Sequence, residues 1–429
     1  MKKFAKESQN ATVVLLFFFS IIRWGMAMTY VEFFDKPFIE NICVSLIKIP
    51  DRIVLVGGDK NVLEKHKERY EKLFIARGHR VEFVLKGVNK NNLNNIVECL
   101  SDIVMAYDDL AFDLTGGGEL YLTAMGIVFE RYKDKNIQMH KYNIKSSRLI
   151  DCDADGNTVD TGALPMLSVK ENISLYGGSV MHYDAGLSDC SDEEFTGVID
   201  TMWEICKKNP KAWNTRVSFF EYLLALPYTQ KQELSFEVDI KRALLSTRKT
   251  LDNKFLSSLM AKGLITYELT DKLLRVNFKN QTVRRCLSKS GQLLEFRVLI
   301  TAVSAVDKKG QPIYTDALSG VFIDWDGEKK ENVPNTENEV DIILMRGAVP
   351  VFISCKNGYT DADELYKLHT VAENFGGSYS VKSLIAGSPS ELSNGAKHRG
   401  IDMGLKIIDC VHTLSEEELV RRLSELWIS

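Results

Sequence analysis

Four side chains in the last third of the chain have the types and spacing that phosphodiester hydrolysis requires. Glu339 and Asp341 are two residues apart in one predicted strand, and Ser354 and Lys356 are two residues apart in the next. Side chains alternate between the faces of a strand, so a hairpin of these strands places Asp341 beside Lys356. The carboxylate would hold Mg²⁺ or Mn²⁺, and the ammonium would stabilise the charge that develops on the phosphate.

Glu295 and Cys355 extend this predicted site. Glu295 lies within the apolar helical run 293–296, where burial of an unpaired carboxylate is costly. The Cys355 side chain points away from the site, but its backbone carbonyl is available to a cation. The expected catalytic residues are Asp341, Lys356, Glu339, Glu295 and Ser354. The expected metal ligands are Asp341, Glu339, Glu295 and the backbone carbonyl of Cys355.

A second candidate site is a glycine-rich turn at 115–118, between a predicted strand (109–114) and a predicted helix (119–132). Glycines let backbone N–H groups approach a phosphate, and a helix N-terminus adds positive potential. Gly57 and Gly58 end another predicted strand, so the two turns could line one crevice. Tight strand-to-helix turns without a ligand are the alternative. The chain has neither a Walker A lysine nor a GxGxxG motif, so ATP and NAD gain no support.

Length and charge point to several domains with one basic region. The chain has 429 residues and a net charge of −4. Between Lys241 and Ser290, twelve Lys or Arg residues stand against three acidic residues, a local balance of +9. Such a stretch is commonly a solvated face, but next to a nuclease-type motif it is a candidate phosphate-binding surface. The eight cysteines form no CxxC pair, which favours a reducing cytoplasm over a zinc site or a disulfide framework.

The first 27 residues have the character of a signal peptide. Residues 1–6 are basic and 11–22 are almost wholly apolar, but this apolar run is too short to span a bilayer as a helix. We interpret 1–27 as an extension or misplaced start outside the fold, and we expect no stable membrane partner. A weak membrane tether is the alternative.

The elements predicted from the sequence fall into three groups. Strands alternate with helices up to about residue 180, which predicts a mostly parallel, doubly wound Rossmann-like sheet. Helices then cover about 193–226 and 251–262, and a basic hairpin follows at 265–278, an order similar to a winged helix. From about 289 the chain returns to mixed α/β character, and this last group carries the predicted catalytic hairpin.

Asp113, Leu114 and the glycine turn, followed by an apolar helix, resemble the CARF domain, the Rossmann-like sensor of CRISPR-associated proteins. The resemblance implies that two such domains pair across a twofold axis and bind a cyclic oligoadenylate, most often cyclic tetra-adenylate. It also implies a second ligand loop at the early 35–37 turn. The ligand-binding residues implied are Asp35, Lys36, Gly57, Gly58, Lys60, Thr115, Gly116, Gly117 and Gly118. Family members often carry a lysine after the glycines, whereas Gly118 and Glu119 follow here, and an acidic residue is unfavourable near phosphates.

The catalytic hairpin resembles the PD-(D/E)xK nucleases, and more closely the CARF-linked nucleases of type III CRISPR systems, the former DUF1887 family. In that family a Glu-bearing helix precedes an NE(L/V)D segment, an ExK-like strand and an ALYKL-type helix. Segments 338–341, 354–356 and 363–368 follow this order. Ser354 departs from the pattern, because most relatives have a metal-binding Glu there, and Glu339 or Glu295 could supply the missing carboxylate.

Pattern and resemblance together predict an α/β chain of three domains. They are a CARF-like sensor at 28–180, a helical or winged-helix-like connector at 181–288, and a restriction-endonuclease-like α/β nuclease at 289–429. The predicted protein is a cytoplasmic homodimer that uses Mn²⁺ or Mg²⁺. Cyclic tetra-adenylate would activate it to cut single-stranded DNA, RNA or both in antiviral defence.

Two alternatives stay open at this point. A ligand-responsive regulator with a degenerate nuclease domain would bind duplex DNA, and neutralising Arg284 and Arg285 would abolish that binding. A ring nuclease that degrades its own activator would need no metal and would survive Asp341→Ala.

Overall fold

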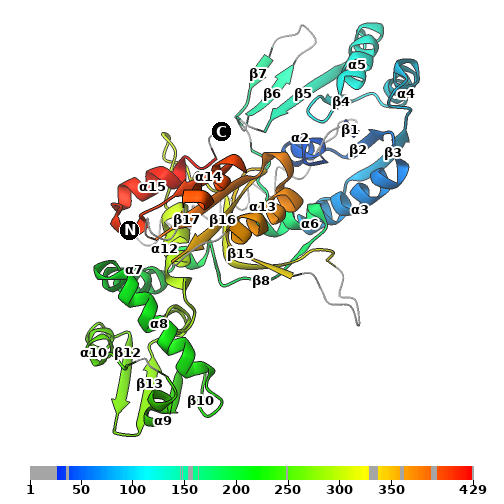
Figure 1. The fold of residues 1–429 in the computed structure, drawn as a ribbon. Helices are drawn as coiled ribbons and strands as arrows, with labels where there is room; N and C mark the ends of the chain where they lie inside the picture. Colours follow the sequence, from blue (N-terminus) through cyan, green and yellow to red (C-terminus); the bar gives the residue numbers. More distant parts are fainter. Residues whose placement is uncertain are drawn as a thin grey trace, which may run out of the picture. The chain divides into compact units, whose positions relative to one another are not determined.

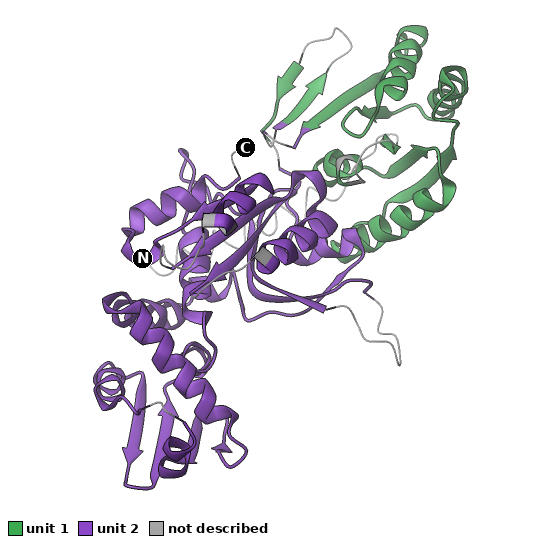
Figure 2. Ribbon diagram, in the orientation of Figure 1, with its two compact units in different colours: residues 1–142, 149–162 green, residues 143–148, 163–429 purple. Residues whose placement is uncertain are grey.

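The computed structural model describes residues 27–34, 38–144, 146, 148–152, 158–162, 164–247, 250–327, 337–357, 362–387 and 394–427 (Figure 1). Residues 1–26 of the predicted extension, and the predicted ligand residues Asp35 and Lys36, lie outside this set. The chain divides into two compact units, residues 1–142 with 149–162 (unit 1) and residues 143–148 with 163–429 (unit 2), as Figure 2 shows. Among the described residues, no helix is both long and apolar enough to cross a membrane.

Unit 1 is built on a seven-stranded sheet. Its strands are β1 (Thr29–Phe34), β2 (Arg52–Gly57), β3 (Glu82–Gly87), β4 (Leu110–Asp113), β5 (Ile137–Asn143), β6 (Arg148–Cys152) and β7 (Thr158–Asp160). The strand order is β3-β2-β1-β4-β5-β6-β7, in which β3 to β5 are parallel and β6 pairs antiparallel with β7. The order reverses direction between β1 and β4, so their carboxyl ends meet at the switch point where ligands bind in such sheets.

Helices cover both faces of this sheet. They are η1 (Phe38–Asn41), α2 (Cys43–Lys48), α3 (Lys60–Ala76), α4 (Leu93–Ala106) and α5 (Glu119–Arg131). Val31 and Phe33 pack in a core with α4 and α5, whereas the next residue, Phe34, packs its ring against His66 and Tyr70 of α3. Strand alternation therefore separates the two helical layers. The prediction of a parallel-rich, Rossmann-like first sheet is confirmed.

Unit 2 contains a mixed sheet that carries the predicted catalytic hairpin. Its strands are β8 (Ser179–His182), β9 (Ala185–Gly186), β14 (Asp316–Asp324), β15 (Glu337–Arg346), β16 (Val349–Lys356), β17 (Val381–Ala386) and β18 (Leu405–Ile408). The order is β18-β17-β16-β15-β14-β8, with β9 also paired to β14. Strands β14, β15 and β16 are antiparallel neighbours, and β16, β17 and β18 are parallel.

The same unit contains a second, smaller sheet. It has the antiparallel order β10-β11-β13-β12, from β10 (Gln230–Lys231), β11 (Ser235–Asp239), β12 (Ile265–Leu269) and β13 (Leu273–Phe278). The helices of unit 2 are α6 (Val169–Tyr176), α7 (Glu193–Lys208), α8 (Pro210–Ala225), α9 (Ile240–Leu245), α10 (Asn253–Ala261), α11 (Gln281–Ser288), α12 (Gln292–Val303), α13 (Ala362–Gly376), α14 (Asn394–Asp402) and α15 (Glu416–Ser424). Short 3-10 turns also occur, at η2 (Asp189–Ser191), η3 (Gly377–Tyr379) and η5 (Val411–Thr413).

One continuous hydrophobic core joins the helices before α12 to the mixed sheet. It includes Trp203 and Phe220 from α7 and α8, Phe296 from α12, and Ile342 and Ile353 from the hairpin. α6 and the first residues of β8 precede residue 181 in the sequence but belong to unit 2. The three-domain division therefore stays a prediction, and the contacts themselves divide the chain near residue 162.

Candidate functional site

The β15–β16 hairpin gathers predicted site residues around one carboxylate oxygen. Asp341 Oδ2 accepts hydrogen bonds from Ser354 Oγ at 3.1 Å and from the Cys355 backbone N–H at 2.6 Å. Lys356 Nζ lies 3.9 Å from the same oxygen. The Cys355 side chain is buried on the opposite face, as strand alternation requires. The hairpin thus places a carboxyl group, a hydroxyl group and an ammonium group side by side, near the C-terminal end of β16.

The helix after the hairpin adds a carboxylate that was not predicted. Glu364 lies in the first turn of α13, and its Oε2 is 3.0 Å from Lys356 Nζ. Burial alone would lower the pKa of Lys356, but the carboxylates of Asp341 and Glu364 outweigh burial and hold that pKa above its usual value. Lys356 is therefore a charged ammonium at neutral pH. An acidic residue in the first turn after the hairpin was the sequence signal for this contact.

Glu295 of α12 is buried and electrostatically linked to the hairpin. Only 4% of the residue is exposed, and Gln292 Nε2 donates a hydrogen bond to it at 3.1 Å. Burial and, to a smaller extent, the neighbouring Asp341 carboxylate raise the pKa of Glu295 to about 8, although Lys289 opposes them. Burial likewise raises the pKa of Asp341, against the influence of Lys356. Acidic groups therefore crowd together at this site.

Glu339 pairs with a cation from another segment. Lys289 Nζ lies 2.6 Å from Glu339 Oε1 and 3.6 Å from Asp184 Oδ2, and Arg285 also approaches Asp184 at 3.7 Å. Gly320 leaves room for Asp184: its φ is +60°, and a Cβ there would lie 2.3 Å from Asp184 Oδ2. Sequence reasoning missed Asp184 and Lys289, because no periodicity or motif links these segments to the hairpin.

The oxygen atoms of Asp341, Glu339, Glu295 and the Cys355 carbonyl are chemically suited to a divalent cation. Carboxylate and carbonyl oxygens are the ligands that Mg²⁺ and Mn²⁺ prefer, and a cation would offset the burial, and the smaller carboxylate repulsion, that raise the pKa values of Glu295 and Asp341. Among the described residues, no three His, Cys, Asp or Glu side chains lie close enough together to hold a metal ion. A small cleft of about 60 Å³ runs along Glu339, Asp341, Ser354 and Lys356 and reaches Glu364. Metal ligation by Asp341, Glu339, Glu295 and the Cys355 carbonyl stays a prediction.

The glycine turn of unit 1 lies at the carboxyl end of β4 and the start of α5. Thr115 is already used within the protein, since its hydroxyl and N–H both donate to Asp113 and the Tyr142 N–H donates to its hydroxyl. A Cβ on Gly116 would lie 1.6 Å from Asn41 Oδ1 and 2.6 Å from the Phe33 carbonyl oxygen. Gly116 is therefore required for close packing of the turn against β1 and η1.

The N–H groups of this turn are available to a ligand. Among the described residues, none accepts a hydrogen bond from the backbone N–H of Gly116, Gly117 or Gly118. All three glycines are buried, and buried N–H groups in proteins nearly always have an acceptor. An anion at the N-terminus of α5 would provide one.

The other predicted glycines lie beside a separate cavity at the ends of β1, β2 and β3. This cavity has a volume of about 520 Å³ and is lined by residues that include Phe34, Gly58, Asn89 and Lys90. Gly57 is buried, and Lys60 is exposed at the first position of α3. Unit 1 therefore has two features at the carboxyl ends of its strands, the glycine turn and this cavity.

A fully buried carboxyl pair lies in the sheet next to the glycine turn. Glu32 and Asp113 are register partners on β1 and β4, and both are 0% exposed. Burial raises the pKa of Glu32 well above its usual value, and the adjacent Asp113 adds to this effect, although the Ser45 hydroxyl donates to Glu32 and opposes it. Burial and the adjacent carboxyl group therefore favour the neutral form of Glu32.

Much of the basic stretch 241–290 is used in contacts within unit 2. Arg275 pairs with Glu237 and Glu268, and Lys279 pairs with Glu194. Arg284 donates to the backbone carbonyl of Gln232, and Arg285 donates to that of Asp184. Because Arg284 and Arg285 already donate within the protein, these contacts count against the hypothesis that the two side chains bind duplex DNA.

Comparisons with known proteins give the fold but no sequence family. No protein-family model matches the sequence, and no curated protein matches it. The chain is similar to protein VC1899 from Vibrio cholerae, with a TM-score of 0.69, 19% identity and coverage of 93% of this chain and 97% of that one. It is also similar to Can2 from Sulfobacillus thermosulfidooxidans in complex with cyclic tetra-adenylate, with a TM-score of 0.63, 16% identity and coverage of 94% and 98%. The chain thus has the fold of these two proteins over nearly its whole length.

Proposed function

We propose that the chain is a metal-dependent endonuclease of type III CRISPR antiviral defence, activated by a cyclic oligoadenylate and acting on single-stranded DNA, RNA or both. Unit 1 is the CARF-like sensor, and the mixed sheet of unit 2 is a nuclease core of the PD-(D/E)xK kind. The smaller sheet with α8, α9 and α10 is a winged-helix-like connector. The protein acts as a homodimer.

The observation that carries this proposal is the position of Lys356 beside Asp341 on the hairpin, together with a buried Glu295 whose pKa the charge of Asp341 helps to raise. A structural ion pair would need one acid and one base, and burying an additional carboxylate there is costly. A catalytic site that binds a metal cation and a phosphate would explain why more carboxyl groups than basic groups are buried there. The fold that the chain shares with a protein solved in complex with cyclic tetra-adenylate supports the sensor half.

The residues would act as follows. Asp341 and Glu295, with Glu339 and the Cys355 carbonyl, would hold Mn²⁺ or Mg²⁺, which when bound polarises a phosphate and lowers the pKa of a bound water. Lys356 stays protonated, so it stabilises the charge on the phosphate and does not act as a base. Glu364 and Asp341 hold the Lys356 ammonium from two sides, and Ser354 orients Asp341.

In unit 1, the glycine turn offers N–H groups to a phosphate of the activator. The cavity beside Gly58 is large enough for a nucleoside portion of the ring. Activator binding would shift the dimer towards a state in which the nuclease sites accept a strand. The raised pKa of the buried Glu32 favours its neutral form, which adds no negative charge near the bound phosphates.

The test is cleavage of a labelled single strand by the purified chain with Mn²⁺ and cyclic tetra-adenylate. Lys356→Ala should lower the rate by about 100-fold or more, because it removes a charged group aimed at the phosphate. Lys397→Ala is the matched control, since Lys397 forms a similar half-exposed ion pair, with Asp409 at 2.6 Å. Unchanged cleavage by Lys356→Ala, or none with any cyclic oligoadenylate, would refute the proposal.

A further inference from the structure

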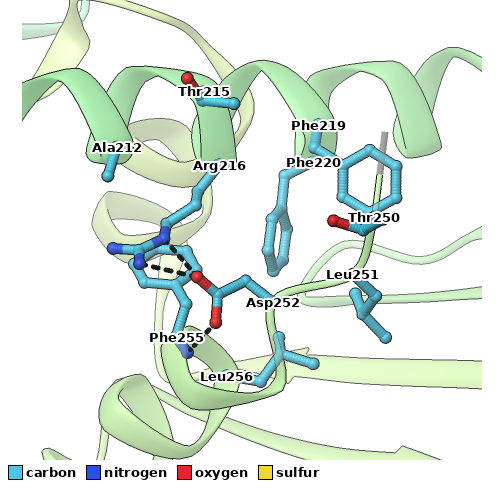
Figure 3. A pocket seen from close by; sticks show the side chains of 10 residues that line it. All are labelled: Ala212, Thr215, Arg216, Phe219, Phe220, Thr250, Leu251, Asp252, Phe255 and Leu256. Atoms are coloured by element: carbon cyan, nitrogen blue, oxygen red, sulfur yellow. Dashed lines mark hydrogen bonds and ion pairs between the residues drawn. The ribbon is translucent and has the colours of Figure 1, made fainter. Parts of the chain in front are cut away.

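Unit 2 has a cavity that the proposed catalytic machinery does not use. It lies between α8 and the start of α10, has a volume of about 500 Å³, and is shown in Figure 3. Its apolar lining consists of the buried side chains of Phe219, Phe220, Phe255 and Leu256. Thr215 and Thr250, both exposed, add hydroxyl groups at its rim. The cavity therefore combines an aromatic floor with a polar rim.

An arginine–carboxylate pair forms one wall of this cavity. Arg216 Nε donates to Asp252 Oδ2 at 2.8 Å, Arg216 Nη2 lies 2.6 Å from the same oxygen, and the guanidinium lies over the Phe255 ring at 4.9 Å (Figure 3). Asp252 is also the N-cap of α10, because its Oδ1 accepts from the Phe255 N–H at 3.0 Å. Within the described part of the chain, these contacts leave the Nη1 amino group of Arg216 for a further acceptor. The two side chains are 30% and 34% exposed, so a ligand in the cavity would reach them.

One pair of amides joins α8 to the end of β16. Asn214 Nδ2 donates to the backbone carbonyl of Asn357, and Asn357 Nδ2 donates to Asn214 Oδ1 at 2.8 Å. The cavity-lining residues of α8, which include Ala212, Thr215 and Arg216, recur every three or four positions, so they share one face of the helix. Asn214 lies on the opposite face, so this contact holds α8 in place and is not part of the cavity.

Nucleic-acid chemistry matches this lining. A nucleobase presents a flat apolar face that stacks on aromatic rings, and a polar edge that pairs with arginine and carboxylate groups. The exposed Lys211 and Lys254 adjoin lining residues Ala212 and Phe255 in the sequence, so positive charge for the strand backbone lies next to the cavity.

We propose that this cavity binds one unpaired nucleobase of the single-stranded substrate. The inference rests on the proposed function and specifies how its substrate is held. A duplex keeps its bases stacked and paired, so the cavity favours single strands over duplexes. Because the cavity would contact the face of the base more than its edge, we expect affinity to depend little on which base is present. A position without a base should bind more weakly.

Ala212→Trp tests this inference, because it places an indole in the cavity and leaves the Arg216–Asp252 pair in place. Ala225→Trp is the matched control at the C-terminal end of the same helix, outside the cavity. Short labelled single strands are titrated with the full chain in chelator, with and without cyclic tetra-adenylate. Some of the strands carry 2-aminopurine or a single abasic position, and no cleavage is needed for the readout.

We expect Ala212→Trp to weaken binding by about tenfold, and Ala225→Trp to bind like the wild type. An abasic position should weaken wild-type binding at one place along the strand and have no further effect on Ala212→Trp. 2-Aminopurine at that place should be quenched only by chains with an open cavity. Equal affinities of Ala212→Trp and the wild type, equal binding of abasic strands at every position, or no binding of single strands would overturn the inference. Strand binding that responds to Ala212→Trp without any metal-dependent cleavage would refute the proposed nuclease and leave the base site standing.

Discussion

At the scale of residues, the proposed catalytic site depends on a surplus of acid held in place by a few cations. Asp341 and Glu364 share Lys356, while Glu339 and Asp184 share Lys289. Ser354 stands next to Asp341 at the position where related nucleases were expected to have a Glu. The alternation of side chains on two strands was enough to predict that Asp341, Ser354 and Lys356 share a face. Lys289 and Asp184 could not be predicted, because tertiary packing alone brings their loops to the site.

Ser354→Glu should restore the carboxylate that the site lacks. The Ser354 hydroxyl lies 3.1 Å from Asp341 Oδ2, so a Glu at this position would carry its oxygens into the same cluster. We expect the Mn²⁺ concentration for half-maximal cleavage to fall by about tenfold, because another hard oxygen ligand joins the cation. Ser354→Gln has the same shape without the charge and should not lower it. An unchanged Mn²⁺ requirement in a folded Ser354→Glu chain would mean that residue 354 does not face the metal.

Glu32→Gln should reveal the buried carboxyl pair through the pH dependence of stability. Because burial raises the pKa of Glu32 above 4.5, its contribution to stability is complete below that pH and is lost as the pH rises through the raised value. The wild type should therefore lose melting temperature relative to Glu32→Gln as the pH rises above 4.5, the usual pKa of a Glu side chain. Glu64→Gln, at an exposed position of α3, is the control. A melting-temperature difference between wild type and Glu32→Gln that does not change with pH would contradict a raised pKa of Glu32.

At the scale of elements, strand ends and helix starts place both candidate sites. α5 begins directly after the glycine turn, and the residue that precedes α12 is Gly291, whose φ of +93° a glycine adopts with little strain. Periodicity predicted most of these elements from the sequence. It missed short segments of two to six residues such as β10, β11 and α9, and also the helices α6, α11 and α14, which have eight or nine residues. Ser415 is the N-cap of α15, and its side chain accepts from the Glu418 N–H.

Gly116→Ala should disrupt the glycine turn. The added methyl group would collide with Asn41 Oδ1 and the Phe33 carbonyl, so we expect unit 1 to lose about 1–3 kcal/mol or more of stability, and binding of cyclic tetra-adenylate to be lost. Gly126→Ala is the control within α5, where a Cβ meets nothing within 4 Å, and it should stabilise the helix by about 0.5–1 kcal/mol. Thermal melting and ligand titration of both variants measure this. Wild-type melting of Gly116→Ala would contradict the close approach of the turn to Asn41.

At the scale of the whole molecule, the chain combines two units with different chemistry. Unit 1 has a glycine-rich turn and a cavity at the carboxyl ends of parallel strands. Unit 2 has a cleft lined by acidic side chains and by the protonated Lys356. The α/β class and the Rossmann-like first sheet could be predicted, because alternating strands and helices admit few topologies. The single core that joins α7, α8 and the mixed sheet could not, because apolar helices do not reveal which sheet they cover.

The most direct test of this account is the initial rate of single-strand cleavage in Mn²⁺, measured with and without cyclic tetra-adenylate. The account predicts a rate that rises with the cyclic nucleotide and saturates, and that falls to background in Asp341→Asn at every concentration. A rate in the wild type that does not change with any cyclic oligoadenylate, or one that survives in Asp341→Asn, would contradict a nuclease at this hairpin controlled by unit 1.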